Sequence, residues 1–388
     1  MRLNKDKILI IGPIGEFGGR ELETGFIASV FAKKYEVKVI STAHYFEKSQ
    51  VMSFGVIDYT SLTKEIFQKS FFIRCILKLL SLLHSNVIVS PKSLSIPFVK
   101  KLLKIERLKA KYLQKELPNY DLIFVCAQVY SNYLEEIIGA AYKHKIPVVF
   151  RTTGTINNDI VALNYSWLSK VSLFIHHSKK NAVQLAKICN INFTVIDQCA
   201  YAESDLLKIK VKDSISRFFT LSRLSAEKQV HNVINAFNKV CAESDFLYIF
   251  GDGLERKKLE SLAKGNSRIE FKGQIACNEV INAFKENDCF IISSSEEAGP
   301  LTGIEAMASG KILISTRVGA MNERLPAYKF WYDGSQKGLE EQLKLVKTLN
   351  NTEAIELSRQ LRARYRDKYS IKQVSEDYMN SIAMFLKR

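Results

Sequence analysis

The sequence predicts an α/β protein with two doubly wound domains that face each other across a cleft. Short runs rich in Ile, Val and Phe recur between stretches of helical periodicity, which is typical of βα units on a parallel sheet. The series pauses at a polar stretch over residues 198–216 and then starts again. We therefore expect two sheets, each binding ligands at the carboxyl ends of its strands.

The elements follow one another in two series. The first series of strands is expected over residues 7–12, 36–40, 121–126, 146–150 and 173–176, with a helix over 19–34 after the first strand. The second series is expected over residues 217–221, 246–250, 268–271, 289–293 and 312–315. This pattern divides the chain into a first domain over 1–200 and a second over 201–370, followed by a terminal segment over 371–388.

Length and composition agree with two ordinary globular domains. The chain has 388 residues, of which 47% are hydrophobic and 25% charged, so each domain can bury a core. The sequence contains no apolar run of the roughly 20 residues that cross a bilayer, and its polar start is unlike a signal peptide. We therefore expect a cytoplasmic protein. Its 7 scattered cysteines suit reduced core thiols better than disulfides or a zinc site.

The net charge of +16 favours an anionic partner. Residues 1–200 contain 27 Lys and Arg against 15 Asp and Glu, a net charge of +12, which leaves 29 against 25, or +4, for residues 201–388. The basic charge is therefore concentrated in the first domain. No recognisable nucleic-acid-binding motif accompanies it, so we expect no nucleic-acid partner.

A glycine-rich segment follows the first predicted strand, with glycines at 12, 15, 18 and 19. Glycines allow close backbone approach, and a helix N-terminus offers free N–H groups to an anion, so Gly18 and Gly19 are candidate ligand-binding residues. A dinucleotide site is one alternative, but the second strand ends without an acid for a ribose. A purely structural turn is the other alternative.

The strongest motif lies in the second domain, where a strand ends in serines before Glu297 and a helix opens near Leu301 and carries Glu305. Eight residues span a little over two helical turns, so both carboxylates can face the strand-end crevice with the helix N-terminus between them. Carboxylates there suit sugar and ribose hydroxyls, and free amides at Gly299, Leu301 and Thr302 suit a diphosphate. Two solvated glutamates beside a loop are the alternative interpretation.

These residues resemble the E-x7-E signature of family 4 glycosyltransferases (glycosyl transferases group 1), which are retaining enzymes with the two-domain GT-B fold. Other segments match the family in order: 222–228 resembles its G-R-L-x-x-E-K-G element, 250–253 its G-x-G turn, and 318–323 its v-G-G-x-x-E element. Residues 365–378 resemble the closing helix that returns to the first domain. The resemblance is clear over residues 217–388 and only topological before that, apart from the glycine-rich loop.

The resemblance implies roles for individual residues. Arg223 and Lys228 would stabilise the charge that develops on the leaving diphosphate, so that no metal ion or other cofactor is needed. Glu297 would bind the donor sugar, Glu305 the ribose hydroxyls, and the turn at Gly251 would contribute to the donor site. The sequence has no D-x-D arrangement of the kind that metal-dependent enzymes with the GT-A fold use.

One departure from the family pattern concerns the first domain. The family often places a histidine after the strand that here ends at Arg151, Thr152 and Thr153. Thr153 is therefore a candidate donor contact in place of that histidine.

The first domain also contains two segments that bear on the acceptor. Residues 71–83 place Arg74, Lys78 and Ser81 on one narrow stripe of an otherwise apolar helix, and residues 100–115 contain seven Lys and Arg against the single acid Glu106. Such a region suits peripheral attachment to an anionic membrane, where lipid-linked acceptors are found. Packing of the first segment inside its domain and solvation of the second are the alternatives.

Taken together, the sequence predicts a hexosyltransferase-type enzyme. It would move a sugar from a nucleotide-sugar donor to a glycan or lipid-linked acceptor, in cell-surface polysaccharide or lipopolysaccharide biosynthesis. The expected location is the cytoplasm, including the inner face of the cell membrane. The alternatives are a sugar-nucleotide epimerase or hydrolase of the same fold, and a non-catalytic binding subunit.

Overall fold

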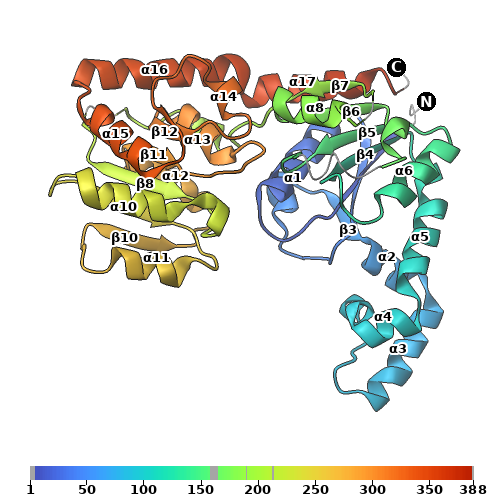
Figure 1. Cartoon of the computed structure of the whole chain (residues 1–388). Helices are drawn as coiled ribbons and strands as arrows, with labels where there is room; N and C mark the ends of the chain where they lie inside the picture. Colours follow the sequence, from blue (N-terminus) through green and yellow to red (C-terminus); the bar gives the residue numbers. More distant parts are fainter. Residues whose placement is uncertain (1–4, 158–164, 189, 212–213, 387–388) are drawn as a thin grey trace. The chain divides into compact units, whose positions relative to one another are not determined.

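The computed structural model describes residues 5–157, 165–188, 190–211 and 214–386, and the chain forms two compact units (Figure 1). The first unit comprises residues 1–176, 182–196 and 375–388, and the second comprises residues 177–181 and 197–374. Each unit contains one parallel sheet. The two doubly wound domains predicted from the sequence are therefore confirmed. The chain changes unit at residues 196 and 374, and the short segment 177–181 belongs to the second unit.

The first unit is built on a seven-stranded sheet in the order β3-β2-β1-β4-β5-β6-β7, and its neighbouring strands pair in parallel. Its strands are β1 (Lys7–Gly12), β2 (Glu36–Ser41), β3 (Asp58–Ser61), β4 (Leu122–Ala127), β5 (Val148–Thr152), β6 (Leu173–His176) and β7 (Phe193–Val195). All six residues of β4 are buried, which agrees with a strand covered on both faces.

Helices of the first unit connect these strands. They are α1 (Gly19–Phe31), α2 (Leu62–Lys69), α3 (Phe71–Leu83), α4 (Pro97–Leu102), α5 (Ile105–Glu116) and α6 (Leu134–Lys143). Single 3₁₀ turns are η1 (Gln50–Phe54), η2 (Pro91–Ser95), η3 (Leu117–Asn119) and η4 (Leu168–Lys170). Serines define two of the helix starts, because the hydroxyls of Ser61 and Ser70 accept from the amides of Lys64 and Ile73.

The core of the first unit has two layers, one on each face of the sheet. One layer joins alternate residues of β1 and β4 to α5 and α6. On the opposite face Phe31 of α1 packs edge-on against Phe124 of β4, with ring centroids 5.3 Å apart. Tyr378, from the C-terminal helix α17 (Ile371–Ala383), packs against Phe124 at 6.4 Å. The last helix thus covers one face of the first sheet.

The second unit is built on a six-stranded parallel sheet in the order β10-β9-β8-β11-β12-β13. Its strands are β8 (Arg217–Leu221), β9 (Phe246–Phe250), β10 (Ile269–Gly273), β11 (Cys289–Ile292), β12 (Ile312–Thr316) and β13 (Trp331–Tyr332).

Helices cover both faces of this second sheet. They are α9 (Glu203–Leu206), α10 (Val230–Val240), α11 (Arg256–Ala263), α12 (Val280–Glu286), α13 (Leu301–Ser309), α14 (Met321–Arg324), α15 (Gln336–Lys347) and α16 (Asn351–Lys368), with 3₁₀ turns η5 (Ala226–Lys228) and η6 (Cys277–Glu279). Apolar residues of α10, α11 and α15 form the core on one face. Those of α9, α12, α13 and α16 form the core on the other. Helix α8 (Lys179–Ala186) starts in the short segment 177–181.

The predicted elements agree with the observed ones to within a few residues, with two kinds of difference. The first helix ends at Phe31, three residues before its expected end. Three strands were not predicted: β3, β7 and β13, which have 4, 3 and 2 residues. Strands this short do not produce a recognisable alternation, and they form because a sheet edge offers them backbone partners.

Candidate functional site

The second sheet reverses its strand order between β8 and β11, and the predicted catalytic residues lie on the loops that leave these two strands. Arg223 and Lys228 follow β8, and Glu297 follows β11. Open parallel sheets bind ligands at the carboxyl ends of strands where the order reverses. The topology therefore brings the three residues, which are spread over 75 positions of sequence, to one edge of the sheet.

Backbone hydrogen bonds join the loops at this edge into one surface. The amide of Leu224 donates to the carbonyl of Asp252 at 2.9 Å, which ties the loop after β8 to the loop after β9. The amide of Ser295 donates to the carbonyl of Glu227 at 2.8 Å, which ties the loop after β11 to the loop after β8. The loops of the predicted motifs are therefore mutually supported.

Lys228 and Glu297 form an ion pair between their Nζ and Oε1 atoms. The hydroxyl of Ser294 donates to the same carboxylate oxygen at 3.0 Å, and the hydroxyl of Ser293 donates to the carbonyl of Lys228 at 2.6 Å. Both charged side chains are largely but not fully buried. This arrangement holds a cation and a carboxylate side by side, where they can bind the anionic and hydroxyl parts of one ligand.

Arg223 differs from Lys228 because its side chain is exposed. Among the described residues its guanidinium forms no ion pair. The pKa of Glu227 is lowered mainly by the hydrogen bond from the Ser225 hydroxyl, and the charge of Arg223 makes a smaller contribution in the same direction. An exposed guanidinium on a loop that is fixed by its backbone is available to a phosphate without first breaking an internal bond.

Glu305 lies on α13 and is only 8% exposed. Its carboxyl group makes no hydrogen bond or ion pair among the described residues, and burial alone accounts for the change in its pKa. Burial raises the pKa of Glu305 to about 7, and its charge contributes to raising the pKa of Cys277, whose main cause is burial of the thiol. A buried carboxyl without a protein partner is costly for stability, which favours a role in ligand binding.

Two of the predicted glycines are needed for close packing. Gly251 has a φ of +127°, and a Cβ there would lie 1.8 Å from the carbonyl oxygen of Ser222. A Cβ on Gly299 would lie 3.1 Å from Nη2 of Arg324 and 3.3 Å from Cβ of His177. The sequence pattern suggested ligand contacts for both, and the structure adds a structural reason for each glycine.

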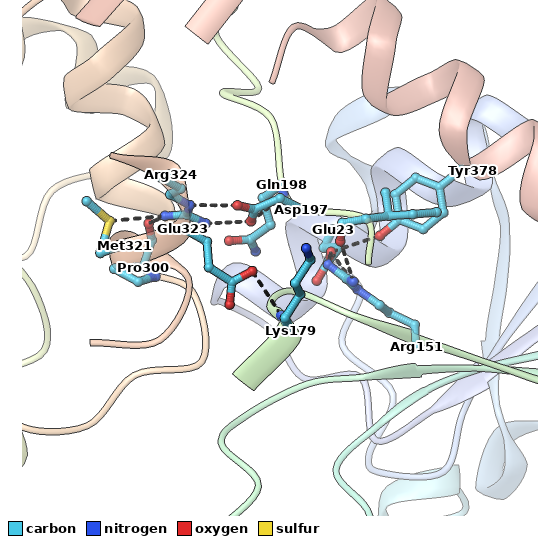
Figure 2. Close-up of polar contacts among 11 residues, drawn as sticks. Glu23, Arg151, Lys179, Asp197, Gln198, Pro300, Met321, Glu323, Arg324 and Tyr378 are labelled. Carbon is cyan, nitrogen blue, oxygen red and sulfur yellow. Dashed lines mark hydrogen bonds and ion pairs between the residues drawn. The ribbon is translucent and has the colours of Figure 1, made fainter. Parts of the chain in front are cut away.

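The buried Arg324 supports the start of α13 through Pro300, the residue before this helix (Figure 2). Leu301 and Thr302 form the first turn of the helix. Arg324 is fully buried and donates through Nε and Nη2 to the two carboxylate oxygens of Asp197, at 2.8 and 2.6 Å. Its Nη1 donates to the carbonyl of Pro300 at 2.5 Å. The guanidinium therefore links the residue before α13 to Asp197 and fixes the loop in which Glu297 lies.

Glu323, the neighbour of this arginine, accepts hydrogen bonds from the amides of Lys179 and Lys180 at 2.9 and 3.2 Å. It therefore caps the first turn of α8 with a carboxylate, which the helix dipole favours. Sequence reasoning assigned Glu323 to a family motif without a role, and it did not single out Arg324 or Ser294. No local sequence signal marked the pairing of Asp197 with Arg324.

In the first unit the glycine-rich loop is bonded within the protein. The amide of Gly15 donates to Oε1 of Glu21 at 2.7 Å, and the amide of Gly18 donates to Oε1 of Gln50 at 2.8 Å. Glu21 lies in the first turn of α1, where its charge opposes an anion. A Cβ on Gly19 would meet no atom within 4 Å. A ligand contact through Gly18 would thus require Gln50 to move, whereas Gly19 stands in open space.

At the end of β5, Arg151 and Thr153 have different surroundings. Arg151 is fully buried and donates to Glu23 through Nε at 3.0 Å and Nη2 at 2.5 Å, while the hydroxyl of Tyr378 donates to Glu23 at 3.1 Å (Figure 2). The residue that stands near the family's usual histidine is thus part of an internal network. The hydroxyl of Thr153 is buried and has no hydrogen-bond partner in the described part of the chain. Thr153 stays a predicted ligand contact.

A cavity of about 310 Å³ lies at the carboxyl ends of β1, β2 and β4 in the first unit. Its lining includes Arg20, Thr42, Gln128, Tyr130 and Asn132. Hydroxyls, amides and an arginine are suited to hydrogen bonding with a polar ligand such as a sugar.

Within 5–157, 165–188, 190–211 and 214–386, no group of three or more His, Cys, Asp and Glu side chains is placed to hold a metal ion. In the same ranges no helix has the length and apolar character required to span a bilayer.

Comparison with solved structures identifies the class of fold. The structure of Anabaena Alr3699/HepE in complex with UDP and glucose matches with a TM-score of 0.73 and 17% identity, covering 98% of this chain and 100% of that one. The pneumococcal O-GlcNAc transferase GtfA in complex with UDP and GlcNAc matches with a TM-score of 0.68 and 13% identity over 100% of both chains. At these identities the likeness concerns the fold, and the chain has the GT-B fold predicted from its sequence.

Sequence comparison finds a family match within the second part of the chain. Residues 208–366 match the family glycosyl transferases group 1, which confirms the resemblance to this family. Alpha-monoglucosyldiacylglycerol synthase of Streptococcus pneumoniae is 34% identical over 113 residues, 28% of this chain and 26% of the relative. N-acetyl-alpha-D-glucosaminyl L-malate synthase of Bacillus anthracis is 30% identical over 139 residues, 34% of this chain and 36% of the relative. The alignments thus span about a quarter to a third of these relatives.

Proposed function

We propose that this protein is a retaining, metal-independent glycosyltransferase that moves a sugar, of hexosyl type, from a nucleotide-sugar donor to a hydroxyl of a glycan or lipid-linked acceptor. The observation that carries the proposal is the edge of the second sheet between β8 and β11. There an exposed arginine, a lysine–glutamate pair and a buried carboxyl without a partner occupy the positions of the family's motifs. The matched family and the relatives' names support sugar transfer as the reaction class.

The residues have distinct roles in this proposal. Arg223 and Lys228 bind the diphosphate of the donor and stabilise the negative charge that grows on it as the glycosidic bond breaks. Glu297, released from Lys228 by the diphosphate, accepts hydrogen bonds from hydroxyls of the donor sugar. Glu305 accepts from the ribose hydroxyls, and the amides of Leu301 and Thr302 at the start of α13 face the phosphates. Two fixed cations in this position replace the charge that a metal ion would supply.

The proposed reaction balances without a cofactor. The bond between the anomeric carbon and the diphosphate oxygen breaks, and the acceptor oxygen attacks the same face of the sugar. The acceptor proton passes to an oxygen of the departing diphosphate, so no protein group needs to act as a nucleophile. The cavity of the first unit near Arg20 and Tyr130 is suited to bind the acceptor. We place the reaction in cell-surface polysaccharide or lipopolysaccharide assembly on the cytoplasmic side of the membrane.

The test is donor binding and transfer with a panel of UDP-, GDP-, ADP- and CMP-sugars in the presence of EDTA. We expect one sugar nucleotide to raise the melting temperature of the native protein and to be hydrolysed slowly or transferred. The variant Arg223→Ala should lose this shift, whereas Arg359→Ala, which removes an exposed arginine of α16, should keep it. Absence of binding for every donor, with or without divalent metal, would refute the proposal.

A non-catalytic binding subunit is the alternative from another class, because the first-domain arginine that stands near the usual histidine is buried in an ion pair. The variant Glu297→Gln separates the two functions. In an enzyme it abolishes transfer while the protein stays folded, and in a binding subunit it leaves partner binding unchanged. A sugar-nucleotide epimerase or hydrolase would instead convert the donor at full rate without any acceptor.

A further inference from the structure

A small helical lobe, formed by residues 70–104 with α3, η2 and α4, lies at the end of the first unit beyond α2 and α5 (Figure 1). Its core, in which Ile73 and Leu77 of α3 pack with Val87, Leu94 and Val99, continues into α2 and α5 through Ile66 and Ile105. The lobe is therefore a folded element whose outer surface can be assigned residue by residue.

The outward face of α3 is apolar. Ile73 and Leu77 point into the core, whereas Phe72 is 71% and Leu82 is 78% exposed, and Phe71, Leu79 and Leu83 are exposed to a similar degree. These five side chains occupy one arc of the helix at 100° per residue. The polar stripe formed by Arg74, Lys78 and Ser81 borders this arc on one flank. On the other flank the half-buried Ile76 and Leu80 join the arc to the packed side, so the apolar surface of the helix is only partly covered.

The apolar surface continues beyond α3. The ring of His84 lies 5.0 Å from that of Phe98 on α4, which joins the two helices at the surface. The described part of the chain has twenty exposed large hydrophobic side chains, and nine of them lie in this lobe: Phe71, Phe72, Leu79, Leu82, Leu83, Ile88, Val89, Phe98 and Leu102. Apolar exposure concentrated in this way marks an interaction surface.

Charge identifies what covers it. The lobe has six basic residues and no acidic one over residues 70–104: Arg74, Lys78, Lys92, Lys100, Lys101 and Lys104. Lys100 pairs with Glu106 outside the lobe at 2.7 Å, and the guanidinium of Arg74 donates to the carbonyl of Phe67 at 3.0 Å. The side chains of Lys78, Lys92, Lys101 and Lys104 form no ion pair within the described ranges. An exposed apolar surface in a lobe with four lysines that form no ion pair needs a partner that offers both apolar and negatively charged groups.

We propose that this lobe docks on an anionic lipid bilayer, with the exposed side chains of α3 and α4 in the interface and the lysines on lipid phosphates. A second copy of the chain fits less well, because a symmetric contact would cover the apolar face but bring two sets of six cations together. A bilayer with anionic lipids satisfies both features at once. The inference rests on the proposed function for its setting, a membrane-associated acceptor, but the surface itself is independent of the donor site.

Vesicle co-sedimentation of the full chain tests the inference, using phosphatidylcholine vesicles with and without phosphatidylglycerol and no donor. We expect binding to the anionic vesicles that weakens with salt, and little binding to phosphatidylcholine alone. The double variant Lys101→Gln with Lys104→Gln should bind about thirtyfold more weakly, since each lysine near an anionic surface contributes about a fivefold factor. The matched control, Lys257→Gln with Lys285→Gln, changes the net charge equally on exposed residues of the second unit and should bind as the native protein does.

A second pair of variants tests the apolar contribution. Phe72→Ser with Leu82→Ser should weaken binding at least about tenfold, whereas Val56→Ser with Met384→Ser, two exposed positions outside the lobe, should leave it unchanged. These side chains are exposed, so all variants should melt as the native protein does. Equal binding to anionic vesicles by the lobe variants and the control variants would overturn the inference. A native protein that does not bind anionic vesicles would also overturn it, and this holds whether the protein is monomeric or forms a dimer through the lobe. Binding to vesicles by a protein that binds no sugar nucleotide would refute the proposed function and leave the docking surface intact.

Discussion

Glu305 is the residue whose ionisation should leave the clearest mark on the stability of the second unit. Burial raises its pKa from an ordinary value of 4.5 to about 7. The native carboxyl therefore holds its proton more tightly than the unfolded one. Stability from this group is fully present below pH 4.5 and is lost as the pH rises through about 7.

The magnitude follows from the two pKa values of Glu305. The interval from 4.5 to about 7 corresponds to about 3 kcal/mol of unfolding free energy, most of which, about 2.5 kcal/mol, is lost between pH 5 and 8. Glu305→Gln removes the titration and keeps the shape. A buried amide without a partner costs about 1–3 kcal/mol at every pH. The absolute unfolding free energy of the variant therefore does not report the titration of Glu305, whereas the change of the unfolding free energy with pH does.

The two tryptophans allow each unit to be followed separately. Trp331 packs in the same core as α13, and Trp167 stacks on Phe150 in the first unit at 5.7 Å. In a Trp167→Phe background, urea unfolding monitored by tryptophan fluorescence reports the second unit alone. The measurement is made from pH 5 to pH 8 with and without Glu305→Gln, and with Glu341→Gln, which changes an exposed acid of α15, as control.

We expect the protein with Glu305 to lose about 2 to 3 kcal/mol more than the Glu305→Gln variant across this range, and the Glu341→Gln control to follow the native curve. The same Glu305→Gln variant should bind the donor more weakly than the native protein, although it loses less stability than the native protein as the pH rises. Parallel stability curves for the protein with and without Glu305 would refute the reasoning, because the carboxyl would then be solvated or paired.

Three further predictions concern the buried supports of the two units. Asp197→Asn leaves the guanidinium of Arg324 opposite a neutral amide and should destabilise the second unit by about 3 kcal/mol, so a loss in urea unfolding below about 1 kcal/mol would contradict the ion-pair argument. Gly251→Ala places a Cβ 1.8 Å from a carbonyl oxygen at a φ of +127° and should cost about 2 kcal/mol or more; an unchanged melting temperature would show that the loop relaxes freely. Tyr378→Phe removes a hydrogen bond to Glu23 and should destabilise the first unit by about 1 kcal/mol, and equal unfolding curves from the first-unit tryptophan would argue against that contribution.

Much of the fold could be predicted because parallel strands buried on both faces are continuous apolar runs. The ten strands expected from such runs are all present, and the pause near residue 200 agrees with the change of unit at 196. The three missed strands lie at or near sheet edges and have four residues or fewer. Their sequences contain too little periodicity to indicate a strand, and neighbouring strands decide their conformation.

The candidate site was predictable to a different extent. Motif order indicated Arg223, Lys228, Glu297 and Glu305, because the residue types and spacing fit a nucleotide-sugar donor. No sequence pattern indicated that Lys228 and Glu297 pair with each other or that Glu305 lacks a partner. These are relations between side chains 69 residues apart, or between one side chain and its surroundings, and they depend on how the loops fold together.

The sequence by itself determined the two-domain α/β class, the positions of most strands along the chain, the resemblance to a glycosyltransferase family and the candidate charged residues of a donor site. These properties follow from local periodicity and short motifs, which act over a few neighbouring residues. Only the tertiary structure decided that Arg151 and Arg324 are buried in ion pairs, that Gly18 is bonded to Gln50, and that one face of α3 stays uncovered. Those properties depend on contacts between residues far apart in the chain, whose burial and pairing are set by packing and not by sequence spacing.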